Sequence, residues 1–130
     1  MYKIEKKEYG YKLTFGGLIN AEEMKKWVEE SRNALTVTPS KFGVFVDMRT
    51  LKPIEKESQV IMEEGQKLYK TKGMERSVVI LESVLVTMQF KRIAKETGIY
   101  NWERYISSQD KPDWEKIGLA WIKDGVDPDK

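Results

Sequence analysis

The stretch FGVFVDMRTLKP, residues 42–53, decides how the rest of the chain must be arranged. Five apolar or small residues lead into Asp47, and Arg49 follows before Pro53 breaks the run. An apolar run without polar alternation is typical of a central strand that is covered on both faces. Open α/β sheets place their sites beyond the carboxyl ends of such strands. The stretch therefore predicts a buried strand that delivers Asp47 and Arg49 to a candidate site in the following loop.

The composition narrows the chemistry that the chain can perform. Its 130 residues are enough for one domain with its own core, and it has no Cys and no His. These absences exclude disulfides, thiol nucleophiles, thiolate metal sites and the commonest general base. A carboxylate, a lysine or a tyrosine could move protons only with a shifted pKa. We therefore expect no enzymatic activity and no cofactor.

The distribution of charge and hydropathy bears on partners and location. The net charge is +2, and the basic and acidic residues are interleaved, so no basic face for nucleic acid is expected. No apolar run approaches the roughly 20 residues that cross a bilayer, which predicts no membrane insertion. The first ten residues are too polar for the apolar core of a secretory signal. A cytoplasmic protein is the expectation.

Hydrophobic periodicity and turn residues predict nine elements. Asn20 and Glu23 form a capping-box-like helix start, Pro39 is expected to close the loop after that helix, and Ser83 can cap a later helix. Pro112 is expected in the first turn of the last helix, in which Trp114 and Trp121 are expected to anchor the core. The other predicted strands span 2–8, 11–15, 75–82 and 102–107, and the other predicted helices span 57–70 and 84–97.

This order, β-β-α-β-α-β-α-β-α, predicts an α/β domain over residues 1–124 with a mainly parallel sheet, followed by a polar tail at 125–130. Gly65 interrupts the second predicted helix, where a glycine costs about 1 kcal/mol relative to alanine. Something is therefore expected to approach the backbone there. A neighbouring strand and a ligand are the two alternatives.

Several short motifs carry a family resemblance over nearly the whole chain. They are residues 17–23 before the first helix, 46–49 at the end of the third strand, 73–77 opening the fourth, 96–99 after the third helix, and Trp121. In this pattern the chain resembles STAS-type domains, and more closely the SpoIIAA-like branch, which shares a superfamily fold with the CRAL-TRIO lipid-binding domains. The resemblance implies a sheet in sequential strand order with an antiparallel first strand. It also implies a regulatory module that acts by binding another protein.

One departure from this family concerns phosphorylation. Antagonists of this class carry an Asp-Ser-Ser-Gly motif whose serine, at the start of the second helix, is phosphorylated by a partner kinase. Alignment on Asp47 places that motif at 55–58, so the acceptor position falls on Glu57 and Ser58 lies one residue late. Glu57 cannot be phosphorylated. Its fixed negative charge would mildly stabilise the helix N-terminus instead.

The candidate binding residues each have a structural alternative. Asp47 and Arg49 could form a binding pair, or Asp47 could cap a turn while Arg49 reaches a carboxylate. Ser83 could hold an anion or cap its helix. Gln89 and Arg92 could line the same crevice as Ser83; otherwise Gln89 bonds a loop carbonyl and Arg92 is solvated.

Two functions follow as hypotheses. The first is a non-catalytic interaction module with an exposed patch around the Asp47 loop and the start of the second helix, including Glu57 and Ser58. The alternative is a protein that binds a lipid-like or anionic small molecule between the second and third helices. Such a ligand would be surrounded by Met62, Gly65, Val86 and Gln89. A homodimer is a further expectation, through Phe42, Phe45, Tyr105 and the hairpin tyrosines.

Overall fold

The central element is the strand β3 (Phe42–Leu51), which the sequence predicts from its apolar run. In the computed structural model, which describes residues 1–37 and 40–130, it lies in the middle of a five-stranded sheet of order β1-β2-β3-β4-β5. β1 is antiparallel to β2, and all other neighbours are parallel. The other elements are β1 (Tyr2–Lys7), β2 (Gly10–Gly17), α1 (Ala21–Ala34), η1 (Leu35–Val37), α2 (Lys56–Lys72), β4 (Met74–Leu81), α3 (Val84–Thr97), η2 (Tyr100–Trp102), β5 (Glu103–Ser107) and α4 (Trp114–Asp124).

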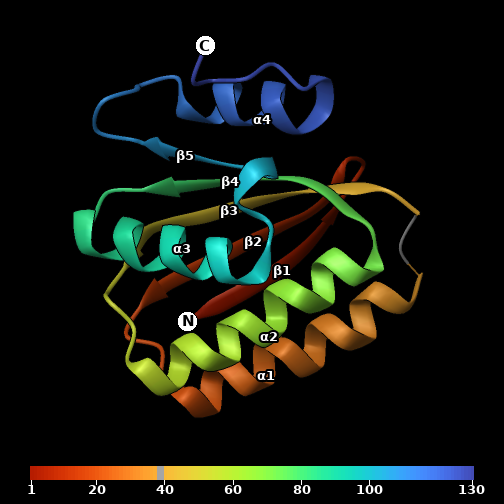
Figure 1. Ribbon diagram of the computed structural model, residues 1–130, viewed down its shortest axis with the longest axis vertical. Coiled ribbons are helices and arrows are strands. Elements are labelled where there is room, and N and C mark those ends of the chain that lie inside the picture. The colour runs from red at the N-terminus through yellow and green to blue at the C-terminus, as the bar shows by residue number, and fades with distance from the viewer. Residues whose placement is uncertain (38–39) are drawn as a thin grey trace.

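The predicted α/β architecture and strand order are confirmed. α1, α2 and α3 cover one face of the sheet and α4 covers the other (Figure 1). Val44, Val46 and Met48 of β3 face the three helices, whereas Phe45 packs in the cluster below α4. This alternation shows why the run had to be apolar throughout, because both faces of the strand are buried.

The helix ends follow the local signals in the sequence. The Oδ1 atom of Asn20 accepts a hydrogen bond from the Glu23 backbone N–H at 2.9 Å, and the Oγ atom of Ser83 accepts one from Val86 at 3.2 Å. Gly73 and Gly98 end α2 and α3 in the left-handed conformation, with φ of 118° and 84°. These caps confirm the predicted starts of α1 and α3 and the predicted ends of α2 and α3.

Two predicted positions near the C-terminus are wrong. Trp102 belongs to η2, not to β5, because its backbone N–H bonds the carbonyl of Ile99 at 2.9 Å. Pro112 lies before α4, in a turn closed by the bond from Trp114 N–H to the Lys111 carbonyl at 3.1 Å. The fixed φ of proline suits the second position of such a turn as well as it suits a first helical turn. The expectation for Pro39 lies outside the described residues.

The close approach expected at Gly65 is made by a residue of α1. A Cβ atom at Gly65 would overlap the Cζ3 and Cη2 atoms of Trp27. The Trp27 ring also stacks on Tyr69, with centroids 5.7 Å apart and planes within 8°. Gly65 therefore faces an indole ring of the core, and both alternatives expected for it, a strand and a ligand, are wrong.

Half of the residues expected at a dimer interface are in the core. Phe42, Phe45 and Tyr11 are buried, and among the named residues only Tyr2, Tyr9 and Tyr105 reach the surface. The part of the sheet that α4 leaves uncovered, on β1 and β2, carries charged side chains such as Lys3, Glu5, Lys7 and Lys12. Charged edge strands resist pairing with another molecule.

The C-terminal tail is joined to the domain by ion pairs from Asp127 and Asp129 to Arg104. Gly125 ends α4, and Asp127 accepts two hydrogen bonds from the Arg104 guanidinium of β5, at 2.8 and 2.9 Å. In the part of the chain that the structure describes, no helix is both long enough and apolar enough to cross a membrane.

Candidate functional site

Asp47 and Arg49 form a bidentate ion pair on the α4 side of β3. The guanidinium donates from Nε to Oδ1 at 3.0 Å and from Nη2 to Oδ2 at 2.9 Å, while the Arg49 backbone N–H also bonds Oδ1. The same guanidinium lies 4.3 Å from the centroid of the Trp114 ring. Both residues are inside β3, which runs on to Leu51, so the expected loop position is wrong. They share a face because they are two residues apart on a strand.

The environment of this pair keeps the carboxylate charged. Burial raises the pKa of Asp47, but the hydrogen bonds and charge of Arg49 outweigh burial and hold that pKa below its ordinary value. Asp47 is buried and Arg49 is half-buried. The carboxylate already accepts three hydrogen bonds from Arg49, which leaves it little capacity for a ligand.

The two residues at the start of α2 differ in exposure. Glu57 is exposed in the first turn of α2. Ser58 is only 1% exposed, and its hydroxyl faces the carbonyl of Ile19 at 3.5 Å. A kinase cannot reach a hydroxyl buried beneath the β2–α1 connection, so the structure offers no phosphoacceptor at this position.

The candidate binding residues at the start of α3 and along it have structural roles in place of ligand binding. Gln89 accepts from the backbone N–H of Ile54 at 2.9 Å and donates to its carbonyl at 3.0 Å, so it ties α3 to the β3–α2 loop. Arg92 donates to Glu96 at 2.8 Å and contacts Gln59. Ser83 caps α3. The seven predicted residues therefore do not converge, because Asp47 and Arg49 lie on the opposite face of the sheet from the rest.

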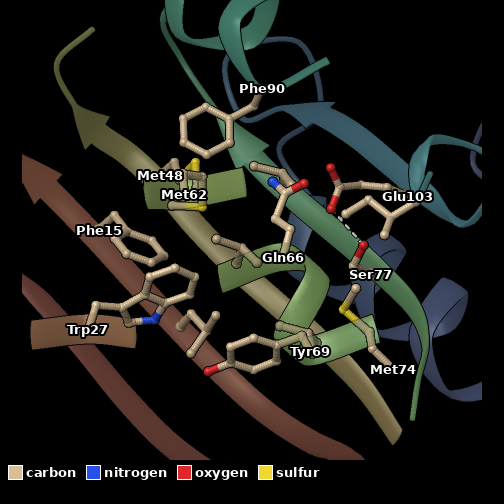
Figure 2. A pocket seen from close by; sticks show the side chains of 15 residues that line it. Phe15, Trp27, Met48, Met62, Gln66, Tyr69, Met74, Ser77, Phe90 and Glu103 are labelled. Atoms are coloured by element: carbon tan, nitrogen blue, oxygen red, sulfur yellow. Dashed lines mark hydrogen bonds between the residues drawn. The ribbon is translucent and has the colours of Figure 1, made fainter. Parts of the chain in front are cut away.

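A small cavity lies between the sheet and the three helices (Figure 2). Its volume is about 30 Å³. A cavity of this size has space for water molecules, whereas pockets for drug-sized ligands have volumes of at least about 300 Å³. The rings of Phe15 and Trp27 lie at one end and the Ser77–Glu103 pair lies at the other (Figure 2). Of the residues expected around a ligand, Met62 lines this cavity, while Gly65 faces Trp27 and Gln89 is occupied by Ile54.

Glu103 is a buried acid that the sequence interpretation missed. It is 5% exposed, and its carboxylate accepts hydrogen bonds from the hydroxyls of Ser77 and Tyr105, both at 2.6 Å. Burial raises the pKa of Glu103 to about 6, although both hydrogen bonds oppose that rise. Glu103 and Tyr105 are two residues apart on a strand, so the sequence shows that they share a face. That this face meets Ser77 follows only from the β4–β5 register.

Replacement of Glu103 by Gln should change how stability depends on pH. Between pH 4.5 and about 6, the unfolded chain loses the Glu103 proton while the folded chain keeps it. The wild-type free energy of unfolding therefore falls across this interval by about 2 kcal/mol, a fall that Gln cannot produce. Urea unfolding at a series of pH values should show Glu103→Gln gaining about 2 kcal/mol on the wild type between roughly pH 4 and pH 7.

The matched control for this series is Glu57→Gln, which removes one exposed carboxylate. Its difference from the wild type should change by much less than that of Glu103→Gln over the same range. A difference for Glu103→Gln that changes no more than this control would contradict the raised pKa of Glu103.

An exposed apolar cluster surrounds the start of α3. Val84, Leu85 and Met88 are 75%, 62% and 63% exposed, and we refer to these three residues as the α3 apolar cluster. A groove of about 510 Å³ runs beside it, between α3 and the β5–α4 connection. Glu82 and Asp110 contribute acidic side chains to this groove. The cluster lies at the carboxyl ends of the parallel strands, where α/β sheets place their sites.

The sequence interpretation noticed Ser83 but not these neighbours. Val84, Leu85 and Met88 look like ordinary helix residues in a sequence, and only the packing shows that they are left outside. Over residues 1–37 and 40–130, no group of three or more acidic side chains gathers closely enough to hold a metal ion. Comparisons with protein families, with curated proteins and with solved structures found no match.

Proposed function

We propose that this chain is a non-catalytic interaction module of the STAS type, and that it binds a protein partner through the α3 apolar cluster. The observation that carries the proposal is the exposure of Val84, Leu85 and Met88 together, next to a groove. Contiguous exposed apolar side chains rimmed by polar residues mark protein interaction sites. The sequential sheet order with an antiparallel first strand agrees with the STAS resemblance.

The small volume of the interior cavity favours this function over a carrier of lipid-like ligands. About 30 Å³ between the sheet and the helices is too little for such a molecule. The side chains that the carrier hypothesis required, such as Val86, are packed in the core. Binding between α2 and α3 would require these elements to separate.

The start of α2 has no accessible phosphoacceptor, which bears on how the module is regulated. Ser58 is buried and Glu57 is exposed. The module therefore binds its partner without a phosphorylation switch at this position. The charged start of α2 is also a poor apolar docking surface, so the interface lies on α3 instead of the region expected from the sequence.

The chemistry of the groove indicates the kind of partner. Glu82 and Asp110 place acidic groups beside the three apolar side chains, while Lys91 lies further along α3. A partner segment that presents an apolar side chain next to a basic one would match this arrangement. Exposed Leu and Met side chains supply the apolar contact area.

The test is affinity capture from an extract of the native cells with the wild type, Leu85→Asp and Val37→Asp immobilised side by side. Val37 is also an exposed apolar residue, at 71%, but it lies between α1 and β3, at the amino ends of the parallel strands. We expect a protein that the wild type and Val37→Asp retain and that Leu85→Asp loses. All three proteins should have the same melting temperature, since both substitutions are at the surface.

Two results would overturn the proposal. One is a partner that Leu85→Asp and Met88→Asp retain as well as the wild type does. The other is the absence of any protein that distinguishes Leu85→Asp from Val37→Asp.

A further inference from the structure

Glu103 stands at the boundary between the interior cavity and a pocket at the surface. Its side chain reaches from β5 toward Ser77 at one end of the cavity (Figure 2), and it is the one charged group among the described residues that line this cavity. Glu103 also lines a pocket of about 120 Å³ beside β5. A carboxylate is costly to bury without a cation, and within the described part of the chain no ammonium or guanidinium lies within 4.0 Å of it. Such a group is a candidate for a role beyond packing.

The groups around this carboxylate come from several elements. The hydroxyls that bond it, those of Ser77 in β4 and Tyr105 in β5, are both neutral and both 2.6 Å away. α2 contributes Gln66 and Tyr69 to the cavity, and burial raises the pKa of Tyr69 to about 12, so neither is charged near neutral pH. The surface pocket is lined, besides Glu103 and Tyr105, by Lys91 of α3, Tyr100 of η2, Arg104 and Asp129. Among the described residues, the charged groups around Glu103 therefore lie in the surface pocket.

Lys91 is the cation of this pocket that is not held by an ion pair. Arg104 donates two hydrogen bonds to Asp127, at 2.8 and 2.9 Å, whereas over residues 1–37 and 40–130 no carboxylate lies within 4.0 Å of the Lys91 Nζ atom. That atom lies 5.4 Å from the centroid of the Tyr105 ring, whose hydroxyl bonds Glu103. The flexible stem of a lysine allows the ammonium to move toward this carboxylate.

Lys91 also belongs to the proposed partner surface. It lines the groove of about 510 Å³ beside the α3 apolar cluster, together with Glu82 and Asp110. Its ammonium thus lies between the acidic groups of the groove and the carboxyl group of Glu103 in β5. A change in the charge of Glu103 would shift the preferred position of this ammonium, because opposite charges attract.

Few groups of this chain change their charge near neutral pH. The chain has no His, and carboxyl groups in water ionise near pH 4. Burial raises the pKa of Glu103 to about 6. The pKa of Glu63 on α2 is also raised, chiefly by its hydrogen bond with Glu96, but this carboxylate lies beside Arg92, away from the Glu103 pocket. Glu63 therefore provides a control for Glu103.

We propose that the charge of Glu103 regulates the partner surface through Lys91. Ionisation of Glu103 draws the ammonium of Lys91 toward β5 and away from Glu82 and Asp110, so the groove becomes more acidic as the pH rises. A partner that presents a basic side chain then binds more tightly above the midpoint of the Glu103 titration than below it. This regulation rests on the proposed function, but the movement of Lys91 needs no partner and is measured on the protein alone.

The first experiment follows three ¹³C NMR signals of the protein alone between roughly pH 5 and pH 7. They are the carboxyl signal of Glu103, the Cε signal of Lys91 and the methyl signal of Met88 in the α3 apolar cluster. We expect all three to shift with one midpoint near pH 6 in the wild type. In Glu103→Gln the Lys91 and Met88 signals should stay constant over this range. Glu63→Gln is the matched control and should keep all three responses.

The second experiment measures the charge at the groove with two soluble nitroxides, one cationic and one anionic. Each enhances the relaxation of the Met88 methyl signal in proportion to its local concentration. The ratio of the cation effect to the anion effect should rise by roughly twofold from pH 5 to pH 7 in the wild type. Lys91→Gln should show a higher ratio already at pH 5 and a smaller rise. Glu103 should still titrate in this variant, with a higher midpoint because a nearby cation is lost.

Three outcomes would overturn the proposal. The first is a Lys91 signal that does not shift while the carboxyl signal of Glu103 titrates, or a Glu103 signal that does not titrate near pH 6. The second is a Met88 response that survives in Glu103→Gln or disappears in Glu63→Gln. The third is a nitroxide ratio that does not change with pH in the wild type. Failure of the proposed function would appear elsewhere, in the capture experiment with Leu85→Asp, which does not depend on these signals.

Discussion

Replacement of Trp121 by Ala is expected to lower the free energy of unfolding by about 3–5 kcal/mol. The side chain is 5% exposed in the cluster between α4 and the sheet, and its Nε1 atom donates to the Ser77 carbonyl at 2.9 Å. The Arg104 guanidinium covers the ring at 4.3 Å from its centroid. Truncation would create a cavity, leave a buried carbonyl without its donor and remove the cation–π contact. Urea unfolding of the purified variant measures the loss.

Trp114 provides a control on the same helix. It is only partly buried, and its ring lies between Phe45, 6.3 Å away by centroids, and the Arg49 guanidinium. Trp114→Ala should cost about 1–2 kcal/mol, because less apolar area is removed from contact. Equal losses at the two positions would contradict the assignment of Trp121 as the anchor of α4.

Replacement of Gly65 by Val is expected to cost about 3 kcal/mol. Any Cβ at this position overlaps the Trp27 ring, which is held by Tyr69 on one side and Phe15 at 5.1 Å on another. Valine and glycine differ by less than about 0.5 kcal/mol in helix propensity, so the loss reports the steric conflict. The measurement is again the free energy of unfolding in urea.

A double-mutant cycle isolates this contact. Trp27→Leu destabilises the core by itself, but it also removes the ring atoms that a valine at Gly65 would strike. Gly65→Val should therefore cost less in the Trp27→Leu background than in the wild type. If the cost is the same in both backgrounds, the glycine is required for some reason other than Trp27.

Much of the architecture was predictable because its signals are local. The Asn20 and Ser83 caps bond backbone groups three residues away, and the glycines that end α2 and α3 act within one turn. The apolar run from Phe42 identified β3 as the central strand. Strands separated by single helices then permitted few arrangements, of which the sequential parallel order is the simplest.

The candidate site was less predictable, because the role of a polar residue depends on its neighbours in space. Asp47 and Arg49 seemed too polar for the interior, which placed them in a loop. They neutralise each other on one face of β3 beneath Trp114, so the strand continues to Leu51. Gln89 likewise found both of its partners on Ile54, 35 residues away in the chain.

The sequence by itself determined the order of the strands and α-helices and the caps of α1 and α3, since these depend on interactions within a few residues. Only the tertiary structure decided which polar side chains find hydrogen-bond partners and which side chains are buried or left exposed. Glu103 meets Ser77 across 26 residues and Trp121 meets Ser77 across 44. The α3 apolar cluster is defined by what does not pack against it. No local pattern encodes these outcomes, because they depend on how distant segments fill or fail to fill the same space.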